Sequence, residues 1–252
     1  MPIVSPRPPK LHRILERDGL AIDYCAGQGA DLVISFSSIG HDPSRLPAPE
    51  FVASATGHRA QSTPRPALFV MDHHRRWGNA PEFSTSLRDA FAYAQTQGPV
   101  RHVTAMGLSM GAYCALIATQ ILPVQAVLAF GPQSSLQQAA TGCARWRDWI
   151  APLKDPRWPV APLPPATCHT VLAHGLEDDL VQARGFGLHS SCDHLLFPTQ
   201  SHASLVPHLK ARGCLAGLVT ALIAGDRRRL LRILQAAGGL RRKTEDIAPP
   251  TA

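Results

Sequence analysis

A serine between two glycines is the first group in this sequence whose surroundings suit covalent chemistry. Residues 107–111 are Gly-Leu-Ser-Met-Gly, between a run that predicts a strand (102–107) and one that predicts a helix (109–122). A G-x-S-x-G turn between strand and helix strains the serine backbone and lifts its hydroxyl out of the sheet edge, and the glycines let neighbouring turns come close. The helix N-terminus favours negative charge beside Ser109, so the backbone N–H of Met110 is a candidate oxyanion donor.

The acid that such chemistry needs has three candidates in one loop. A serine hydroxyl is a poor nucleophile until a base removes its proton, and a carboxylate must orient that base. The apolar run 170–175 predicts a strand, and three acidic residues follow its carboxyl end: Glu177, Asp178 and Asp179. We expect Asp178 to orient the base. Glu177 and Asp179 are the alternatives, and one of the three can cap the next helix.

The base is expected after the last predicted strand, 194–199. His202 lies three residues beyond that strand, so its loop can turn back over the serine. The simpler interpretation is an exposed loop histidine. His208 is the competing base, but it lies farther along, within the next predicted helix. We therefore predict that His202 is the general base for Ser109.

Short apolar runs alternate with helical periodicity along most of the chain, which predicts a doubly wound α/β domain. Their length suits strands buried on both faces of a parallel sheet. The predicted strands are 20–24, 31–36, 67–71, 102–107, 126–131, 170–175 and 194–199. Apolar stripes predict helices at Leu87–Ala94, 109–122 and Leu215–Leu222. Gly27-Gln28-Gly29 resembles a hairpin turn between the first two strands. The expected fold is therefore α/β, with a mostly parallel central sheet and helices on both faces.

Two segments depart from this alternation within what we expect to be a single domain over 1–252. Residues 132–166 are rich in proline and hold three tryptophans, which favours an inserted lid. Residues 226–237 predict a basic helix that Asp226 caps, and we expect it to pack on the sheet with a solvated basic face. A helix that binds a membrane surface or an acidic partner is the alternative. The proline-rich first ten residues predict a poorly ordered arm.

Composition excludes several other classes of protein. The chain has 252 residues, a formal net charge of +7, 45% hydrophobic residues and 17% charged residues, which indicates a globular protein. No apolar run of about 18 residues predicts a transmembrane helix, and no apolar region predicts a secretory signal, so we expect a cytoplasmic protein. Twelve histidines form no H-E-x-x-H pattern, so no metal site is expected. The basic residues concentrate at the two ends without interleaved aromatic residues, so nucleic acid is not an expected partner.

At these motifs the sequence resembles the α/β-hydrolase superfamily, from about Leu20 to Leu222. The resemblance is carried by residues 107–111, by H-G-x-x-D at 174–178 and by the loop bearing His202. It implies a mostly parallel sheet of eight strands, with no metal or organic cofactor. It also implies activity on esters, thioesters or amides. In the family's chain order Ser109 would be the nucleophile, Asp178 the orienting acid and His202 the base.

The second oxyanion donor is where this sequence departs from the family pattern. In the family that donor follows an early strand, often after a His-Gly pair. Here the strand 31–36 continues as Ser37-Ser38-Ile39, with no such pair. Because the donor is a backbone group, an N–H near Ser37 or Ser38 can still serve. The two hydroxyls are also candidates to bind a polar substrate.

A narrower resemblance involves the loop after strand 67–71. The chain is similar to a little-characterised bacterial branch of the superfamily, found near polysaccharide or glycan assembly, which combines a D-x-x-x-x-W-x-N loop with a later P-Q and R-W. The matching residues are Asp72, Trp77, Asn79, Pro132-Gln133 and Arg145-Trp146. From it we predict that Asp72, Trp77 and Gln133 bind substrate. Purely structural contacts are the alternative, and Asp72 as the acid would be badly placed in chain order.

The predicted function is a serine-dependent carboxylic-ester hydrolase that works through an acyl-enzyme. Its substrate would be a small-molecule or glycan-linked ester. Two alternatives stay open. An acyltransferase would pass the same acyl-enzyme to a sugar or other hydroxyl, and a non-catalytic adaptor would keep the fold alone. The motif around Ser109 cannot separate hydrolysis from transfer, because the two differ only in what attacks the intermediate.

Overall fold

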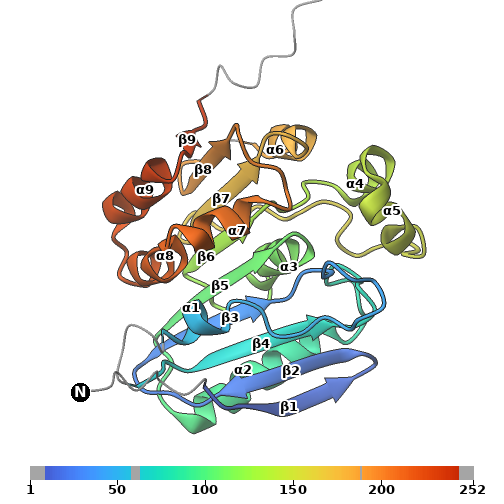
Figure 1. Ribbon diagram of the computed structural model, residues 1–252. Coiled ribbons are helices and arrows are strands. Elements are labelled where there is room, and N and C mark those ends of the chain that lie inside the picture. The colour runs from blue at the N-terminus through green and yellow to red at the C-terminus, as the bar shows by residue number, and fades with distance from the viewer. Residues whose placement is uncertain (1–8, 58–62, 188, 244–252) are drawn as a thin grey trace, which may run out of the picture.

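The protein is built around one nine-stranded sheet, seen in a computed structural model that describes residues 9–57, 63–187 and 189–243 (Figure 1). The strand order is β1-β2-β4-β3-β5-β6-β7-β8-β9. The six strands from β4 to β8 in this order are parallel, and β1, β2 and β9 pair antiparallel at the edges. The strands are β1 (Leu11–Arg17), β2 (Leu20–Cys25), β3 (Asp31–Phe36), β4 (Ala67–Asp72), β5 (His102–Leu108), β6 (Ala126–Phe130), β7 (His169–Gly175), β8 (Cys192–Phe197) and β9 (Leu240–Arg241).

Helices cover both faces of the sheet, as expected, and divide the apolar interior into two cores. One core includes α2 (Phe83–Gln97) and α3 (Met110–Ala118). The other includes α1 (Val52–Thr56), α7 (Leu205–Ala211), α8 (Cys214–Ile223) and α9 (Arg227–Ala236). The central strands are buried on both faces, which explains why they appear in the sequence as continuous apolar runs. The carboxyl ends of the parallel strands therefore meet at one edge, where ligand sites of such sheets form.

The number of strands and the pairing near the edges of the sheet differ from the sequence prediction. The sheet has nine strands, two more than the seven apolar runs predicted and one more than the resemblance implied, because β1 and the two-residue β9 add to its edges. The unexpected β1 is mostly exposed, so its sequence shows no apolar run. The Gly27–Gly29 turn is not a hairpin: β2 pairs with β1 and β4, and β4 separates it from β3. Residues 1–8 of the predicted arm lie outside the described residues.

The segment expected to form a lid contains two short helices, α4 (Leu136–Gly142) and α5 (Ala144–Ile150). They project from the end of the sheet (Figure 1). The segments that enter and leave these helices pair antiparallel at their base. The Leu136 N–H donates to the Pro159 carbonyl at 2.9 Å, and the Ala161 N–H donates to the Ser134 carbonyl at 3.0 Å. The helices therefore sit on a closed loop whose two ends are hydrogen-bonded to each other.

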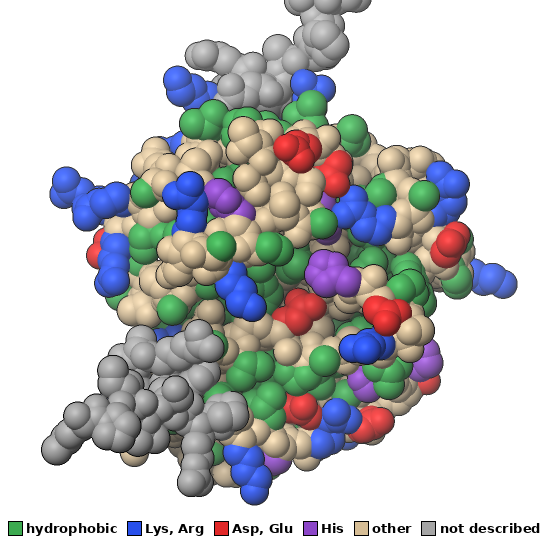
Figure 2. Space-filling view, in the orientation of Figure 1, with side chains coloured by type: hydrophobic (Ala, Val, Ile, Leu, Met, Phe, Trp, Pro, Cys, Tyr) green, Lys and Arg blue, Asp and Glu red, His purple; other side chains and the backbone are tan. Residues whose placement is uncertain are grey.

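The basic helix α9 packs mainly against α8, and its buried Leu230 and Leu234 lie in the core on one face of the sheet. Asp226 accepts a hydrogen bond from the Arg229 N–H at 2.9 Å, which caps the helix as predicted. On the face shown in Figure 2, Lys and Arg side chains are spread among acidic ones rather than gathered in one patch. Among the described residues no helix is long and apolar enough to cross a bilayer.

Candidate active site

Ser109 sits in the strained turn between β5 and α3 that the sequence predicted. Its backbone has φ 56° and ψ −122°, and its side chain is 2% exposed. Backbone segments pass too close to the flanking glycines for any side chain there. A Cβ on Gly107 would lie 2.3 Å from the carbonyl carbon of Gly111, and one on Gly111 would lie 2.1 Å from the Phe36 oxygen. The turn is thus locked between its own helix and the end of β3.

The carboxylate on the predicted base is that of Asp179, not the expected Asp178. His202 Nδ1 lies 2.7 Å from Asp179 Oδ2, and the Asp179 side chain is 1% exposed. The Asp178 side chain, 37% exposed, turns the other way. It accepts the backbone N–H of His202 at 2.5 Å and pairs with Arg145 at 3.0 Å. Asp178 therefore holds the histidine loop, whereas Asp179 holds the imidazole; Glu177 is exposed.

The end of β6 brings a third segment against this pair. Gly131 has φ 54°, and a Cβ there would lie 2.8 Å from His202 Nδ1 and 3.0 Å from Asp179 Oδ2. No side chain fits at this position, so the chain passes directly beside the pair. Because Nδ1 is occupied by the carboxylate, Nε2 is the ring nitrogen left for chemistry.

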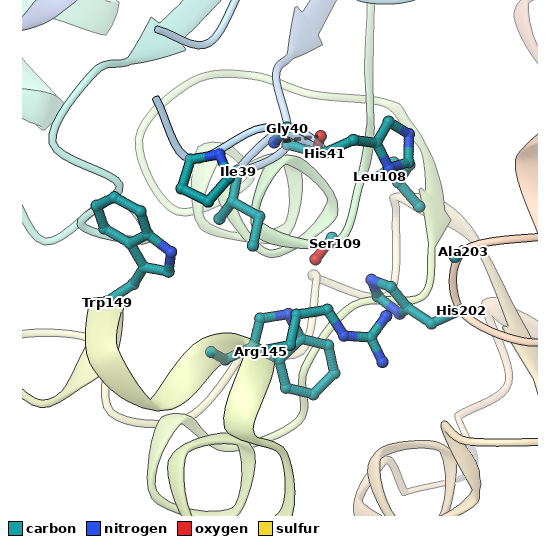
Figure 3. Close-up of a pocket in the computed structure, with 12 residues that line it drawn as sticks. Ile39, Gly40, His41, Leu108, Ser109, Arg145, Trp149, His202 and Ala203 are labelled. Carbon is teal, nitrogen blue, oxygen red and sulfur yellow. Dashed lines mark hydrogen bonds between the residues drawn. The ribbon is translucent and has the colours of Figure 1, made fainter. Parts of the chain in front are cut away.

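Ser109 and His202 line one pocket of about 290 Å³ at the carboxyl edge of the sheet (Figure 3). Figure 3 shows the imidazole beside the serine, with Trp149 on the far side of the cavity. Two tryptophans, Arg145 and the loop from Ser38 to Pro43 complete much of its wall. In the described part of the chain no hydrogen bond joins the hydroxyl to the imidazole. Ser109 Oγ instead accepts one from Gln133 Nε2 at 3.2 Å.

The three residues predicted to bind substrate lie behind the pocket rather than in its wall. Gln133 and Trp77 are both 0% exposed, and Trp77 Nε1 donates to Gln133 Oε1 at 2.9 Å. Asp72 is buried and accepts the backbone N–H groups of His74 and Arg76 at 3.1 and 2.6 Å. Burial raises the pKa of the Asp72 carboxyl. Asp72 and Trp77 therefore shape their loop, and only Gln133 touches a reactive group.

The candidate oxyanion donors differ in availability. Met110 begins α3, where backbone N–H groups have no acceptor within the helix. The Ser37 N–H donates to the Val70 carbonyl at 3.0 Å, so it is occupied. The Ser38 hydroxyl is bound to Glu50 at 2.6 Å, and Ser38 lines the pocket. The next residue, Ile39, lines the pocket.

Both serine hydroxyls of this loop have hydrogen-bond partners within the protein, although Ser38 also lines the pocket. The Ser37 hydroxyl donates to the Ala48 carbonyl at 2.6 Å, and the Ser38 hydroxyl donates to Glu50. Burial raises the pKa of the Glu50 carboxyl, and its bonds to Ser38 oppose that shift. The two hydroxyls therefore fold the loop that follows β3.

Helix α5 closes over the site through contacts from consecutive turns. The Trp146 ring meets the His202 ring edge-on, with centroids 5.1 Å apart, and Arg145 forms the ion pair with Asp178. One turn later, Trp149 lies under the guanidinium of Arg75 at 4.3 Å. Arg75 also donates to the Ile39 carbonyl at 2.8 Å. The lid and the loop after β3 are thus joined across the cavity, a role of Arg75 that the sequence did not reveal.

A buried chain of hydrogen bonds reaches the site from the far edge of the sheet. Arg242 donates to His194 Nδ1 at 2.9 Å, and His194 Nε2 lies 2.8 Å from His174 Nδ1. His174 Nε2 lies 3.0 Å from the Pro132 carbonyl, which can only accept. Burial lowers the pKa of His174 to about 4 and that of His194 well below its ordinary value, so both rings are neutral at pH 7.

Other reactive residues have structural surroundings. His208, the competing base, binds the Ala237 carbonyl at 2.7 Å within the α7 region. Cys114 is buried in the core beneath the serine turn, where burial raises the pKa of its thiol. Among the described residues no three His, Cys, Asp or Glu side chains are grouped as metal ligands would be.

The comparisons with known proteins concern the fold. No protein-family model and no curated protein matches this chain. Among solved structures it is similar to the capsule O-acetyltransferase of Neisseria meningitidis serogroup A, with 12% identity and a TM-score of 0.57 over 81% of this chain and 92% of that one.

Two further structures extend the likeness. The 2,6-dihydroxy-pseudo-oxynicotine hydrolase is 14% identical, with a TM-score of 0.57 over 89% of this chain and 70% of that one. The Pyrococcus horikoshii acylaminoacyl peptidase is 14% identical, with a TM-score of 0.55 over 90% of this chain, which spans 41% of that chain. Together with the strand order and the serine turn after β5, these likenesses show that the chain has the α/β-hydrolase fold.

Proposed function

We propose that the protein is a serine-dependent acyl hydrolase acting on carboxylic esters. The observation that carries the proposal is the Asp179–His202 pair at 2.7 Å, which opens on the same pocket as the strained Ser109. A buried carboxylate beside Nδ1 accepts a hydrogen bond from the Nδ1–H group. It therefore favours the neutral tautomer that carries its proton on Nδ1 and its lone pair on Nε2. That lone pair is what a base needs to take the serine proton.

In the proposed reaction, His202 Nε2 takes the proton of Ser109 as Oγ attacks the acyl carbonyl. The tetrahedral oxyanion is held by the N–H of Met110 and by one from the loop after β3. We propose Ser38 or Ile39 for this second donor because both line the pocket, whereas the Ser37 N–H is occupied. Oγ and Nε2 must approach each other when substrate binds. Such bonds are often long in free enzymes and tighten in the complex.

Asp179 replaces Asp178 in this proposal as the orienting acid. It is the carboxylate on Nδ1, and it stabilises the imidazolium that forms when Nε2 is protonated. Asp178 keeps the backbone of His202 in place and binds the lid through Arg145. The site needs no metal in this mechanism, because the backbone N–H groups and the imidazole supply the charge stabilisation.

Acyl transfer to a hydroxyl is the second candidate. It is favoured by the likeness to a capsule O-acetyltransferase and by the two tryptophans in the pocket wall, since flat aromatic rings suit the apolar faces of sugars. Water and a sugar hydroxyl would attack the same acyl-enzyme. Adding candidate sugar acceptors and measuring the ratio of transfer to hydrolysis decides between them.

The test of the proposed function is labelling of Ser109 with a fluorophosphonate, combined with hydrolysis of p-nitrophenyl esters of increasing chain length. We expect the native protein to label and to hydrolyse short esters. Ser109→Ala should lose labelling and at least about 10³-fold in rate while keeping its thermal unfolding midpoint. A native protein that does not label, or a Ser109→Ala variant that labels equally, would instead favour a non-catalytic adaptor.

A further inference from the structure

The side-chain amide of Gln133 contacts the same oxygen that the proposed reaction uses. Gln133 follows β6, two residues beyond Gly131, and its Nε2 lies 3.2 Å from Ser109 Oγ. The residue is completely buried, so it reaches the serine from inside the protein rather than from the pocket. A buried hydrogen bond at a reacting atom affects the charge that develops there.

The chemistry of Trp77 decides which end of the amide faces the serine. An indole N–H can only donate a hydrogen bond. Because Trp77 Nε1 lies 2.9 Å from one end of the Gln133 amide, that end is the carbonyl oxygen, and the NH₂ group faces Ser109. Trp77 is also completely buried, so water does not compete for either bond. Gln133 is therefore a fixed donor to Oγ.

The backbone on both sides of Gln133 is held as well. His174 Nε2 donates to the Pro132 carbonyl at 3.0 Å. On the other side the Ser134 N–H donates to Gln182 Oε1 at 2.8 Å. A donor fixed at both the side chain and the backbone costs little reorganisation when charge develops on the oxygen it faces.

We propose that Gln133 stabilises Ser109 Oγ as the leaving group when the acyl-enzyme breaks down. The inference rests on the proposed function, in which Ser109 is the nucleophile. Water attacks the acyl carbon, and its proton passes to His202 Nε2. The tetrahedral intermediate then collapses: the carbon–Oγ bond breaks, its electron pair stays on Oγ, and His202 returns the proton to Oγ. The carboxylic acid leaves, and the serine hydroxyl is restored.

The hydrogen bond from Gln133 affects the two halves of the reaction unequally. In acylation Oγ is the attacking atom, and a donor on it draws away electron density that the attack needs. In deacylation Oγ is the departing atom, and the same donor stabilises the negative charge that the broken bond leaves behind. Loss of the donor therefore slows deacylation more than acylation, whether water or a hydroxyl acceptor attacks.

The experiment measures the two steps separately with p-nitrophenyl acetate. Gln133→Met keeps the length of the side chain and removes its N–H groups. We expect the deacylation rate constant to fall by about tenfold or more, as for loss of a hydrogen bond to a charged group, while acylation stays within about threefold. The variant should release p-nitrophenol in a burst, and intact-protein mass spectrometry should show the acetyl-enzyme accumulating.

Two further variants separate this role from general loosening of the site. Trp77→Phe removes the bond that orients the amide, so it should slow deacylation in the same direction but less. It also provides a test if Gln133→Met does not fold. Gln125→Met is the matched control: it removes a partly buried glutamine amide whose oxygen accepts the Val103 N–H at 2.7 Å, at the amino ends of β5 and β6, opposite the end that holds Ser109. We expect it to lower the unfolding midpoint while the ratio of the two rate constants stays near that of the native protein.

The outcomes distinguish this inference from the proposed function. If the native protein labels with fluorophosphonate but Gln133→Met slows both steps equally, or speeds acylation without accumulating acyl-enzyme, Gln133 is not a leaving-group donor and the inference is overturned. The same conclusion follows if Gln125→Met shifts the ratio as strongly. If the native protein neither labels nor forms an acyl-enzyme, the proposed function itself fails, and this inference fails with it.

Discussion

The two sides of the proposed active site are built in different ways. On the serine side, five consecutive residues contain the proposed nucleophile, its strained turn and one proposed oxyanion donor. Its geometry depends on backbone packing: Gly107 and Gly111 touch main-chain atoms, and Gly111 lies against the Phe36 carbonyl. Local sequence therefore specifies most of what this side needs.

The acid–base side is assembled from distant segments. Asp179 follows β7, His202 follows β8, Gly131 follows β6, and Trp146 comes from the lid. Their contacts are mostly between side chains, and each depends on how a separate loop leaves the sheet. The position of Ser109 is therefore fixed by backbone packing, whereas the position of the His202 imidazole is fixed by tertiary contacts between side chains. Substitutions should expose that difference.

The largest contrast is expected between the two adjacent aspartates. Asp179→Asn replaces the carboxylate on Nδ1 with an amide, which favours the wrong tautomer and no longer stabilises the imidazolium; kcat should fall by about 10³- to 10⁴-fold. Asp178→Asn, the matched control, loses the Arg145 ion pair and weakens one backbone bond, so kcat should fall by less than about tenfold. Steady-state hydrolysis of a short p-nitrophenyl ester measures both.

Equal losses in the two variants would contradict the separation of their roles. Thermal unfolding of both proteins serves as the control, because each aspartate also contributes to folding through its hydrogen bonds. A larger loss for Asp178→Asn would restore the assignment first expected from the sequence.

The central sheet and the serine could be predicted because their signals are local. Buried parallel strands need apolar side chains on both faces, and the turn at Ser109 needs glycines at fixed spacing. The sequence limits the orienting acid only to three adjacent residues. Two neighbouring positions in a loop point their side chains in different directions, so one contacts the imidazole and the next contacts the backbone. Asp178 and Asp179 differ in that one step.

Long-range contacts explain the other differences. Trp77 and Asp72 have side chains that could line a pocket, yet both are buried behind its wall. Whether a side chain is buried depends on the whole fold, so the local sequence does not show it. Strand β1 is not predicted from the sequence, because its exposed residues are polar and interrupt the apolar run that would mark a strand. Arg75 braces the lid and the loop after β3 through segments distant in sequence, so no local pattern marks it.

The second prediction concerns acid sensitivity of the folded protein. The pKa of His174 is lowered by burial from 6.5 to about 4, so between these values the unfolded chain binds a proton that the folded chain does not. Stability is then lost as the pH falls through 6.5, and the loss levels off below about 4. The expected cost is about 3 kcal/mol in unfolding free energy. Urea unfolding at pH 7.5 and at pH 4.5 measures most of it.

The contribution of His174 is isolated by comparison with His174→Gln. Glu50 and Asp72, whose pKa values are raised by burial, gain protons in the folded state and oppose the loss, whereas His194, whose pKa is lowered by burial, adds to it. Because they remain in the variant, the difference in pH dependence reports the histidine. A variant as acid-sensitive as the native protein would show that His174 is not held neutral by the fold.

The third prediction concerns the backbone packing of the serine side. Gly111→Ala adds a Cβ 2.1 Å from the Phe36 carbonyl oxygen. Because the nearest atoms that this Cβ meets belong to the main chain, β3 and α3 must separate. We expect a loss of about 1–3 kcal/mol in unfolding free energy, measured by urea titration, together with a marked fall in activity. Gly142→Ala is the control, since a Cβ there meets no atom within 4 Å. If both variants were equally stable, the turn would not be locked by this contact.

The smallest effect is expected at the lid, where two tryptophans one helical turn apart have different neighbours. Both line the cavity, but Trp146 packs edge-on against His202, whereas Trp149 lies under Arg75. Trp146→Leu should therefore loosen the imidazole and lower kcat by up to about tenfold, since a contact of this kind contributes about 1 kcal/mol. Trp149→Leu should raise KM for bulky esters and leave kcat near native. Steady-state kinetics on esters of two sizes separates these effects. If both variants change only KM, the lid contributes only to the shape of the pocket. The position of the His202 imidazole would then not depend on its contact with Trp146.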